Sequence, residues 1–359
     1  MSIRIPISND ITALADAMIR DIGLQSKDIF SPVFIVTQTR GMNSWLKYRM
    51  AEKDGIAANL SFLTPEDIVY EVYKILGGNY RNKISRRDID WVIFSILSEE
   101  GFKKQFPERA AYFYTEDGKD VMKQWELAAK MADLFDQYQI YRSEVIEGWN
   151  RQEVSEIEVK YQWQAYLWQK MGDKAEDKLI DFTAIKTEIL EKLDIPENQM
   201  AIRQKLPTLY LFGLSIVTNY HLEILHKLSQ YIDIHWYISN PAPECYWFED
   251  VSEEKVFLLK MEEEKVNHIT IGHPLLTDWG KVVQNTFRLL TKYEDFINAI
   301  LDIEVNEIDK STLLSSFQHT IQENQAEFPV IPKPLFDDGT ITITSNYSKR
   351  REVETVYNY

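Results

Sequence analysis

The apolar positions of the first sixty residues follow two alternating periods. Residues 3–7 (IRIPI) have the pattern of a short strand, and residues 32–37 (PVFIVT) form a continuous apolar run typical of a strand buried on both faces. Each is followed by apolar side chains at helical spacing. Asn9 or Asp10 is the candidate N-cap of the first helix, and a second helix is expected from near Gly41. This strand-helix repeat predicts a parallel α/β sheet.

The period changes to a helical one from about residue 65 to residue 200. Helical spacing of apolar residues is found in the segments 64–76, 87–99, 118–142 and 159–174. Strand patterns are nearly absent over the same stretch. The sequence therefore predicts a large all-helical insertion inside the α/β domain.

The strand-helix pattern returns after Pro207. Residues 208–215 (TLYLFGLS) and 233–241 (DIHWYISNP) are expected to be strands on either side of an amphipathic helix at 219–231. Residues 241–335 are acidic and less regular, with helical stretches near 284–300 and 311–323.

The last part of the chain has the pattern of a new β-α unit. A strand is expected at 340–346 (TITITSN) and a helix from near Lys349, and we expect that the sequence is truncated inside this unit. The expected organisation has four parts: a first α/β part (1–75), the helical insertion (76–200), a second α/β part with the irregular acidic segment (201–335), and the start of a further domain (336–359).

The charge balance bears on possible partners. The 359 residues contain 40 Lys and Arg against 56 Asp and Glu, a net charge of −16, which argues weakly against a free-standing duplex-DNA binder. Two local basic clusters, at Arg81–Arg87 and Lys349–Arg351, are more often solvated turns than phosphate contacts. Cys245 is the one cysteine, and the chain has neither a signal-peptide pattern nor a run of about 18 apolar residues. We therefore expect a cytoplasmic protein without a membrane segment.

The loop after the first strand bears on nucleotide binding. A phosphate-binding loop needs glycines, a Lys and a Ser or Thr, whereas the loop here (SNDITA) has neither Gly nor Lys and contains Asp10, which would repel phosphate. The strand 208–215 ends in Phe212-Gly213-Leu214, with no carboxylate for magnesium. ATP binding is therefore not expected.

Nuclease or metal chemistry has no clear candidate either. Asp133 and Asp136 lie three residues apart on one helical face, which is more often a solvated or salt-bridged face than a metal site. The six histidines are scattered. We expect no catalytic residue, metal or cofactor in this chain.

Seven segments, in order, resemble the N-terminal region of the RecC family, the gamma subunit of exonuclease V. They are VTQTRGMNSWLKYRMAEKDGIAANLSFLTP at 36–65, ADLFDQYQIYR at 132–142, WQAYLW at 163–168, LYLFGLS from residue 209, IHWYISNP from residue 234 with Tyr246-Trp247 after it, HPLLTDWGK at 273–281, and SNYSKRREVETVY from residue 345. Each alone is moderate evidence, but the resemblance spans essentially the whole chain.

The resemblance implies a superfamily 1 helicase-like fold of the P-loop NTPase type whose ATP motifs are lost, in agreement with the loop and strand end described above. It implies a non-catalytic subunit of the RecBCD helicase-nuclease, in double-strand break repair by homologous recombination. Such a subunit splits duplex DNA, guides the strands and recognises the Chi signal as single-stranded DNA. RecB-like and RecD-like partners supply the motors, and the RecB-like one the nuclease.

The resemblance also implies a set of Chi-reading positions. Those that stand as the family has them are Gln38, Asp133, Leu134, Asp136, Gln137 and Arg142. Those that depart are Arg40, Ser44, Thr64 and Tyr70, where better-known members carry Thr, Gln, Leu and Trp. The amide, carboxylate and guanidinium groups suit base readout, and Tyr70 retains a ring that can stack on a base. The departures put the identity of the recognised sequence in doubt.

Two rival interpretations remain. A helicase-nuclease scaffold of the AddB type would keep a P-loop at the N-terminus and an iron-sulfur nuclease domain near the C-terminus. The SNDITA loop and the lone cysteine argue against it. A protein-interaction scaffold that no longer touches DNA is favoured by the net charge of −16 and by the 13% aromatic content.

Overall fold

The computed structural model describes residues 2–25, 30–78, 86–115, 118–175, 181–214, 217–261, 270–303, 307–327 and 330–358. The chain forms two compact units. Unit 1 consists of Met1–Ile3, Asp28–Leu211 and Val217–His235, and unit 2 of Arg4–Lys27, Phe212–Ile216 and Trp236–Tyr359.

The strands form a six-stranded parallel sheet in the order β3-β2-β6-β7-β1-β8. Its strands are β1 (Ile3–Ser8), β2 (Val33–Val36), β3 (Leu60–Leu63), β6 (Thr208–Phe212), β7 (Asp233–Ser239) and β8 (Ile300–Asp302). In unit 1, β2 pairs in parallel with β3 and β6, and in unit 2, β1 pairs in parallel with β8. The interior of β7 is buried without interruption, including His235.

In the α/β part of unit 1, the described residues form α2 (Arg40–Asp54), α3 (Pro65–Ile75), α10 (Phe182–Lys192), α11 (Pro196–Lys205) and α12 (Asn219–Ser229). Helix α3 packs against α10, α11 and α12. Its buried face consists of Ile68, Val69, Val72 and Tyr73. The sequence separation of these helices means that α3 is held by segments more than a hundred residues further along the chain.

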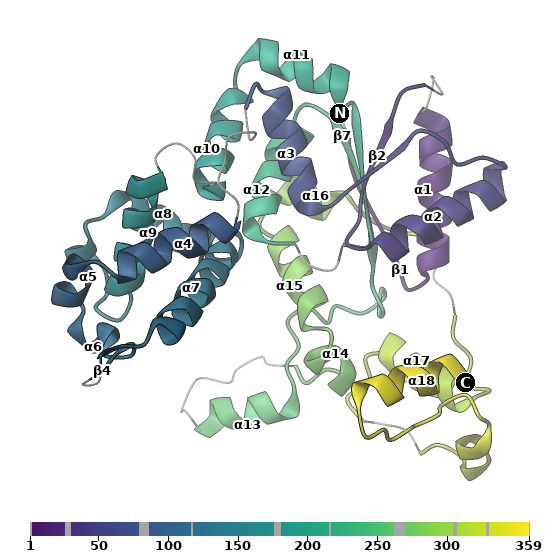
Figure 1. Ribbon diagram of the computed structural model, residues 1–359. Coiled ribbons are helices and arrows are strands. Elements are labelled where there is room, and N and C mark those ends of the chain that lie inside the picture. Colours follow the sequence, from purple (N-terminus) through teal and green to yellow (C-terminus); the bar gives the residue numbers. More distant parts are fainter. Residues whose placement is uncertain are drawn as a thin grey trace. The chain divides into compact units, whose positions relative to one another are not determined.

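The helices between α3 and α10 have a core of their own. Their elements are α4 (Arg86–Leu97), α5 (Glu100–Gln105), α6 (Pro107–Ala110), β4 (Tyr114–Thr115), β5 (Gly118–Lys119), α7 (Val121–Tyr141), α8 (Ser143–Arg151), the 3-10 turn η1 (Val154–Glu156) and α9 (Gln162–Ala175). Phe102, Phe113, Phe135, Trp149 and Trp168 fill this core. Figure 1 shows these helices grouped together, in blue. The predicted helices at 87–99, 118–142 and 159–174 correspond to α4, α7 and α9.

Unit 2 combines β1, β8 and α1 (Ile11–Gln25) with shorter helices. These are α13 (Glu253–Met261), α14 (Pro274–Asp278), α15 (Lys281–Leu290), α16 (Glu294–Asn298), α17 (Leu313–Gln322), the 3-10 turn η3 (Lys333–Asp337) and α18 (Lys349–Asn358). Trp247 is fully buried, and its indole N–H donates to Asn240 Oδ1 at 2.9 Å. Phe248 and Phe287 stack with ring centroids 3.9 Å apart.

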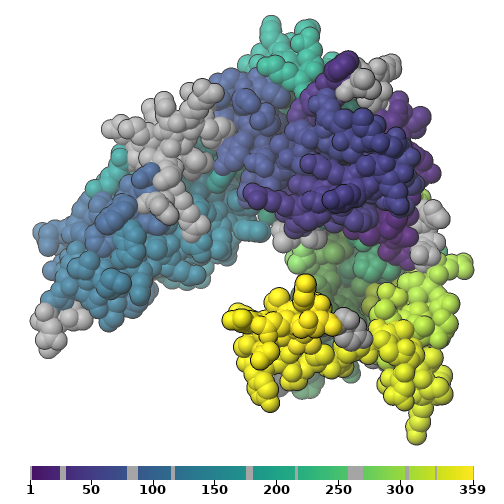
Figure 2. All heavy atoms as spheres, turned by 45° about the vertical axis from the view of Figure 1, so that its right-hand side comes forward, coloured from purple at the N-terminus to yellow at the C-terminus, as the bar shows by residue number. Residues whose placement is uncertain are grey.

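One expected element is not formed. Residues 340–346, the predicted strand TITITSN, have no strand conformation, and Ile343 is 92% exposed. A strand requires a neighbour for its backbone hydrogen bonds, and no described segment pairs with this one. The C-terminal residues, yellow in Figure 2, lie at the surface. Two strands that the sequence pattern did not indicate, β3 and β8, complete the edges of the sheet.

Candidate nucleic-acid interface

The loops after β2 and β3 leave the same edge of the sheet, because the two strands are parallel and Val36 is level with Leu63. The Thr37 N–H donates to the Leu63 carbonyl at 2.9 Å. Gln38 follows, half-buried, and Thr39 caps α2 by accepting from the Met42 N–H at 3.2 Å. Sequence-predicted Gln38 therefore lies at the carboxyl edge of the sheet, beside the loop that contains Thr64.

Arg40 and Ser44 lie on the first turns of α2. Both are exposed, and their spacing of four residues puts them on one face of the helix. The dark violet segment that includes α2 lies at the surface in Figure 2. These two side chains are accessible to a ligand.

Thr64 is the N-cap of α3. Its hydroxyl donates to Asp67 Oδ2 at 2.8 Å and accepts from the Asp67 N–H at 3.1 Å. Asp67 Oδ2 also accepts from the Thr64 N–H, which completes a capping box. The hydroxyl of Thr64 is therefore engaged in holding α3.

Tyr70 lies one and a half turns into α3, half-buried, with its ring centroid 6.1 Å from that of Phe182 on α10. Burial first, and then the charges of Glu66, Asp136 and Asp67, raise the pKa of Tyr70 to about 12. The charge of Asp136, on α7, is therefore felt at the phenol. Tyr70 is a neutral hydroxyl donor and part of an aromatic cluster.

The predicted residues of α7 have different surroundings. Asp133 Oδ2 accepts from Gln137 Nε2 at 3.4 Å and lies 3.9 Å from Lys130 Nζ. Leu134 packs against the core of the helical insertion. Of this group, Asp136 is the residue that the structure links electrostatically to Tyr70.

Arg142 lies just beyond α7. The helix ends at Tyr141, and Arg142 is its C-cap with φ −140° and ψ 45°, so the expected helix through residue 142 is one residue too long. The guanidinium carbon lies 5.6 Å from the centroid of the Tyr138 ring. Arg142 is exposed and forms no ion pair with any residue that the structure describes. Its charge is therefore available to a ligand.

The structure thus links Tyr70 with Asp136, Gln38 with the loop of Thr64, and Asp133 with Gln137. We predict that the side chains of five of these positions line one surface, and this stays a prediction: Gln38, Tyr70, Asp133, Asp136 and Arg142.

Phe182 and Tyr220 are two residues of this region that the sequence pattern did not indicate. Their ring centroids are 6.3 Å apart, and Phe182 lies next to Tyr70 in turn. The Tyr220 hydroxyl is buried, and no described group is in hydrogen-bonding range of it. Burial raises the pKa of Tyr220, and the proximity of Tyr70 raises it further. No local motif marks either residue, because each is brought here from a separate helix.

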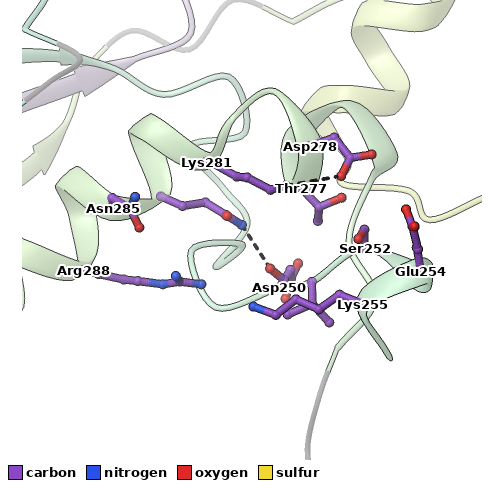
Figure 3. A pocket seen from close by; sticks show the side chains of 11 residues that line it. Asp250, Ser252, Glu254, Lys255, Thr277, Asp278, Lys281, Asn285 and Arg288 are labelled. Carbon is purple, nitrogen blue, oxygen red and sulfur yellow. Dashed lines mark hydrogen bonds and ion pairs between the residues drawn. The ribbon is translucent and has the colours of Figure 1, made fainter. Parts of the chain in front are cut away.

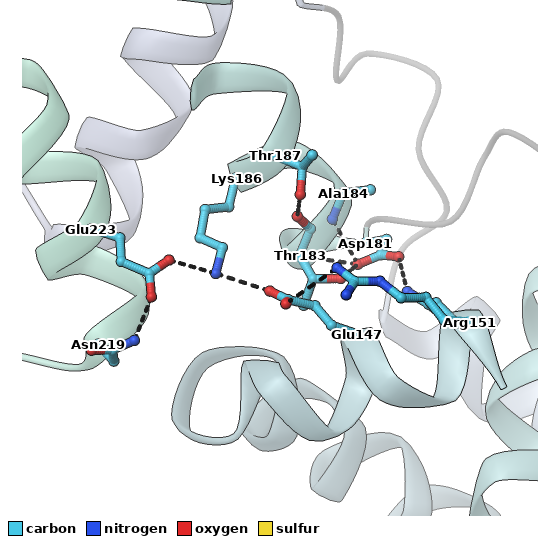
Figure 4. A network of polar contacts seen from close by, with 10 residues as sticks. Glu147, Arg151, Asp181, Thr183, Ala184, Lys186, Thr187, Asn219 and Glu223 are labelled. Atoms are coloured by element: carbon cyan, nitrogen blue, oxygen red, sulfur yellow. Dashed lines mark hydrogen bonds and ion pairs between the residues drawn. The ribbon is translucent and has the colours of Figure 1, made fainter. Parts of the chain in front are cut away.

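A buried lysine connects the helical insertion to the α/β part of unit 1 (Figure 4). Lys186 Nζ of α10 lies 2.9 Å from Glu147 of α8 and 2.7 Å from Glu223 of α12. Burial lowers the pKa of Lys186, but hydrogen bonds to the two carboxylates outweigh burial, so the net pKa is raised. The ammonium stays charged and fixes the three helices that surround Phe182 and Tyr220.

In the loop between β1 and α1, an aspartate accepts hydrogen bonds from the first N–H groups of the helix. Asp10 Oδ1 accepts from the N–H groups of Thr12 at 2.7 Å and Ala13 at 3.3 Å. These are the donors that a phosphate would use at a helix N-terminus. The end of β6, at Phe212, is followed by Gly213 with φ 61°, where the left-handed backbone favours glycine.

The parts of the chain that the structure describes show neither a metal site nor a membrane-spanning helix. Within those ranges no group of three or more His, Cys, Asp or Glu residues is arranged to hold a metal ion. No described helix is both long and apolar enough to cross a membrane. Of the two basic clusters, residues 81–85 lie outside the described residues, and Arg350 and Arg351 both pair with Glu354.

Residues 3–324 match the model of the family described as RecC, N-terminal domain. The chain is 24% identical over 394 residues to the RecBCD enzyme subunit RecC of Haemophilus influenzae, which covers 94% of this chain and 34% of that protein. It is 24% identical over 369 residues to the same subunit of Escherichia coli, with 92% and 32% covered. For Buchnera aphidicola the values are 25% identity over 338 residues, with 92% and 30% covered. The chain thus spans about a third of the length of these relatives, and by the extent of the family match it belongs to the RecC family, whose N-terminal domain it contains.

Proposed function

We propose that this chain is the N-terminal part of a DNA-handling subunit of a RecBCD-type helicase-nuclease, and that it recognises the Chi signal as single-stranded DNA. In this proposal it acts in the cytoplasm with RecB-like and RecD-like subunits, in double-strand break repair by homologous recombination. Its fold is helicase-like with lost ATP motifs, and it has neither an ATPase nor a nuclease site of its own. The membership of the RecC family supports the role as a subunit.

The observation that carries the recognition role is the half-exposed ring of Tyr70 packed beside Phe182, at a position where the charge of Asp136 is also felt. Tyr70 and Asp136 are 66 residues apart in the sequence, and the resemblance to the family gives both of them the same role. A ring that is half-exposed beside Phe182 can stack on a base, and a carboxylate can accept from a base amino group. Arg142, exposed and stacked on Tyr138, supplies a cation for a phosphate or a base edge.

The lost ATP site is supported by the hydrogen bonds of Asp10. A carboxylate that already accepts from the first N–H groups of α1 both fills the phosphate position and repels the phosphate charge. The motor function therefore falls to the partner subunits, and this chain contributes binding.

The proposal is tested in the assembled helicase-nuclease with a full-length subunit. Tyr70→Ala and Asp136→Asn should weaken the Chi-dependent change in products, since a stacked base contributes about 1–3 kcal/mol. Tyr70→Phe should retain most of the response, because the ring is kept. Tyr112→Ala, which removes an exposed tyrosine of the helical insertion far from this aromatic cluster in sequence, is the control.

Arg142→Ala belongs to the same set of variants. Its loss should reduce the response to Chi by an amount equivalent to about 1–3 kcal/mol if the guanidinium reads a base, and it should leave bulk unwinding unchanged. Both quantities are measured in one preparation, together with the thermal stability of the complex. A proportional loss of Chi response and unwinding in the Tyr70→Ala and Arg142→Ala complexes would contradict the recognition role and favour a structural one.

A further inference from the structure

Unit 2 contains a polar hollow that plays no part in the proposed recognition of Chi. Its cavity volume is about 490 Å³, and it lies between the start of α13 and the exposed face of α15 (Figure 3). On α15, Lys281, Asn285 and Arg288 are spaced at i, i+4 and i+7, so they form one stripe along the helix. Lys255 and Ser252 line the opposite wall.

Two cations converge in this hollow. In Figure 3 the side chains of Lys255 and Arg288 extend toward each other from the two helices. Among the residues that the structure describes, neither forms an ion pair. Two like charges that extend toward each other repel, and an anion bound between them would relieve this repulsion.

Two of the three carboxylates around the hollow contact other side chains. Asp250 is 5% exposed and accepts from Asn324 Nδ2 at 2.7 Å. Asp278 lies 3.8 Å from Lys281, and Glu254 is exposed at the rim. Gln284 closes the floor, since its Nε2 donates to the carbonyls of Trp247 and Asp250. The acidic groups therefore lie at the floor and the rim, and the two unpaired cations share the space between them.

We propose that this hollow binds a phosphate group, which is held by Lys255 and Arg288 with the neutral donors Ser252 and Asn285 beside it. A guanidinium suits the tetrahedral oxygens of phosphate by bidentate hydrogen bonds, and an ammonium adds a point charge. The phosphodiester backbone of single-stranded DNA is the source of the phosphate. This part of the inference rests on the proposed function, whereas the phosphate site itself does not.

The site is tested on the 359-residue chain with two probes, inorganic phosphate and a short oligodeoxythymidine. Arg288→Gln and Lys255→Gln remove one charge each and leave a shorter, neutral polar side chain in place. Either should weaken the binding of both probes roughly three- to tenfold, which is the range for a charge-assisted contact at an exposed site. For the oligonucleotide, the slope of log K against log salt should fall by about 0.7 for each phosphate contact that is lost.

Two further variants complete the set. Lys310→Gln removes an exposed lysine from the same unit, outside the hollow, and should leave the affinity for both probes unchanged. Glu254→Gln removes a carboxylate at the rim and should strengthen the binding of phosphate, because less repulsion remains.

The outcomes separate this inference from the proposed function. Weaker binding of both probes in the Arg288 and Lys255 variants supports the site and its nucleic-acid source. Loss of phosphate binding with unchanged oligonucleotide binding supports the site and overturns that source. Absence of phosphate binding to the unmodified chain, or equal losses in Lys310→Gln, overturns the site. None of these results changes the Chi response of the Tyr70 and Arg142 variants, so the two proposals fail independently.

Discussion

At the scale of single residues, His221 makes the stability of the protein sensitive to pH. The ring is buried in α12, its Nδ1 lies 2.9 Å from the Thr218 hydroxyl, and its Nε2 has no described hydrogen-bond partner. Burial lowers the pKa of His221 to about 4. In the unfolded chain the pKa is about 6.5, so the unfolded state takes up the proton first as the pH falls.

The stability contributed by neutral His221 is therefore complete above pH 6.5 and declines as the pH falls toward 4. Between pH 7 and pH 5 the loss amounts to about 2 kcal/mol of unfolding free energy. Urea denaturation at the two pH values should show this decline in the unmodified chain and a smaller one in His221→Gln, whose amide does not titrate. His226→Gln, on the same helix, is the control and should retain the full decline. An equal decline in all three proteins would rule out His221 as its source.

At the scale of elements, two glycines have opposite roles. Gly280 is the N-cap of α15, and a Cβ built there would lie 2.4 Å from the Leu276 carbonyl oxygen and 3.0 Å from the Trp247 ring. Because the near atom belongs to the backbone, it cannot move away easily. A Cβ at Gly172, inside α9, meets nothing within 4 Å.

Gly280→Ala should therefore destabilise unit 2 by about 2 kcal/mol, since overpacking forces backbone shifts. Gly172→Ala should stabilise unit 1 by about 0.5–1 kcal/mol, because alanine loses less entropy in a helix. Thermal denaturation followed by circular dichroism measures both. Shifts of the same sign in the two variants would contradict the assignment of the clash to Gly280.

The elements that could be predicted from the sequence are those with a local signal. The strands at 3–7 and 32–37 and the helices that follow them were predictable, because long buried runs and helical stripes are local signals. β3 was missed because its four residues include Ser61 and are all only partly buried, and β8 was missed because three residues are too few to show a period. The end of α7 at Tyr141 was also missed, because neither Gly nor Pro separates it from α8 and the break is visible only in the backbone angles of Arg142.

The candidate site was predictable only in part, for a related reason. The roles assigned to Tyr70, Asp136 and Arg142 came from the resemblance to the family. The ring of Phe182 beside Tyr70 depends on the packing of α10 against α3, which no sequence period encodes. The expected strand at 340–346 illustrates the reverse case: its alternation is correct for a strand, but no described strand lies beside it.

At the scale of the whole molecule, we predict that the chain does not bind ATP. Titration of the chain with a non-hydrolysable ATP analogue and magnesium should give no saturable heat and no thermal shift. The reasons are the Asp10 carboxylate at the start of α1 and the absence of a carboxylate at the end of β6. Saturable micromolar binding that is abolished by a change at Asp10 would contradict the lost ATP site.

The pairing of β1 with β8 determines when the sheet can be completed during synthesis on the ribosome. Ile5 is level with Ile300, so one edge of β1 stays open until residue 300 has been synthesised. The contacts that build the core from α4 to α9 are much closer in sequence, so this core can form during translation. An unpaired strand edge is a template for association with other chains. The nascent protein therefore has a long interval in which β1 depends on protection from aggregation.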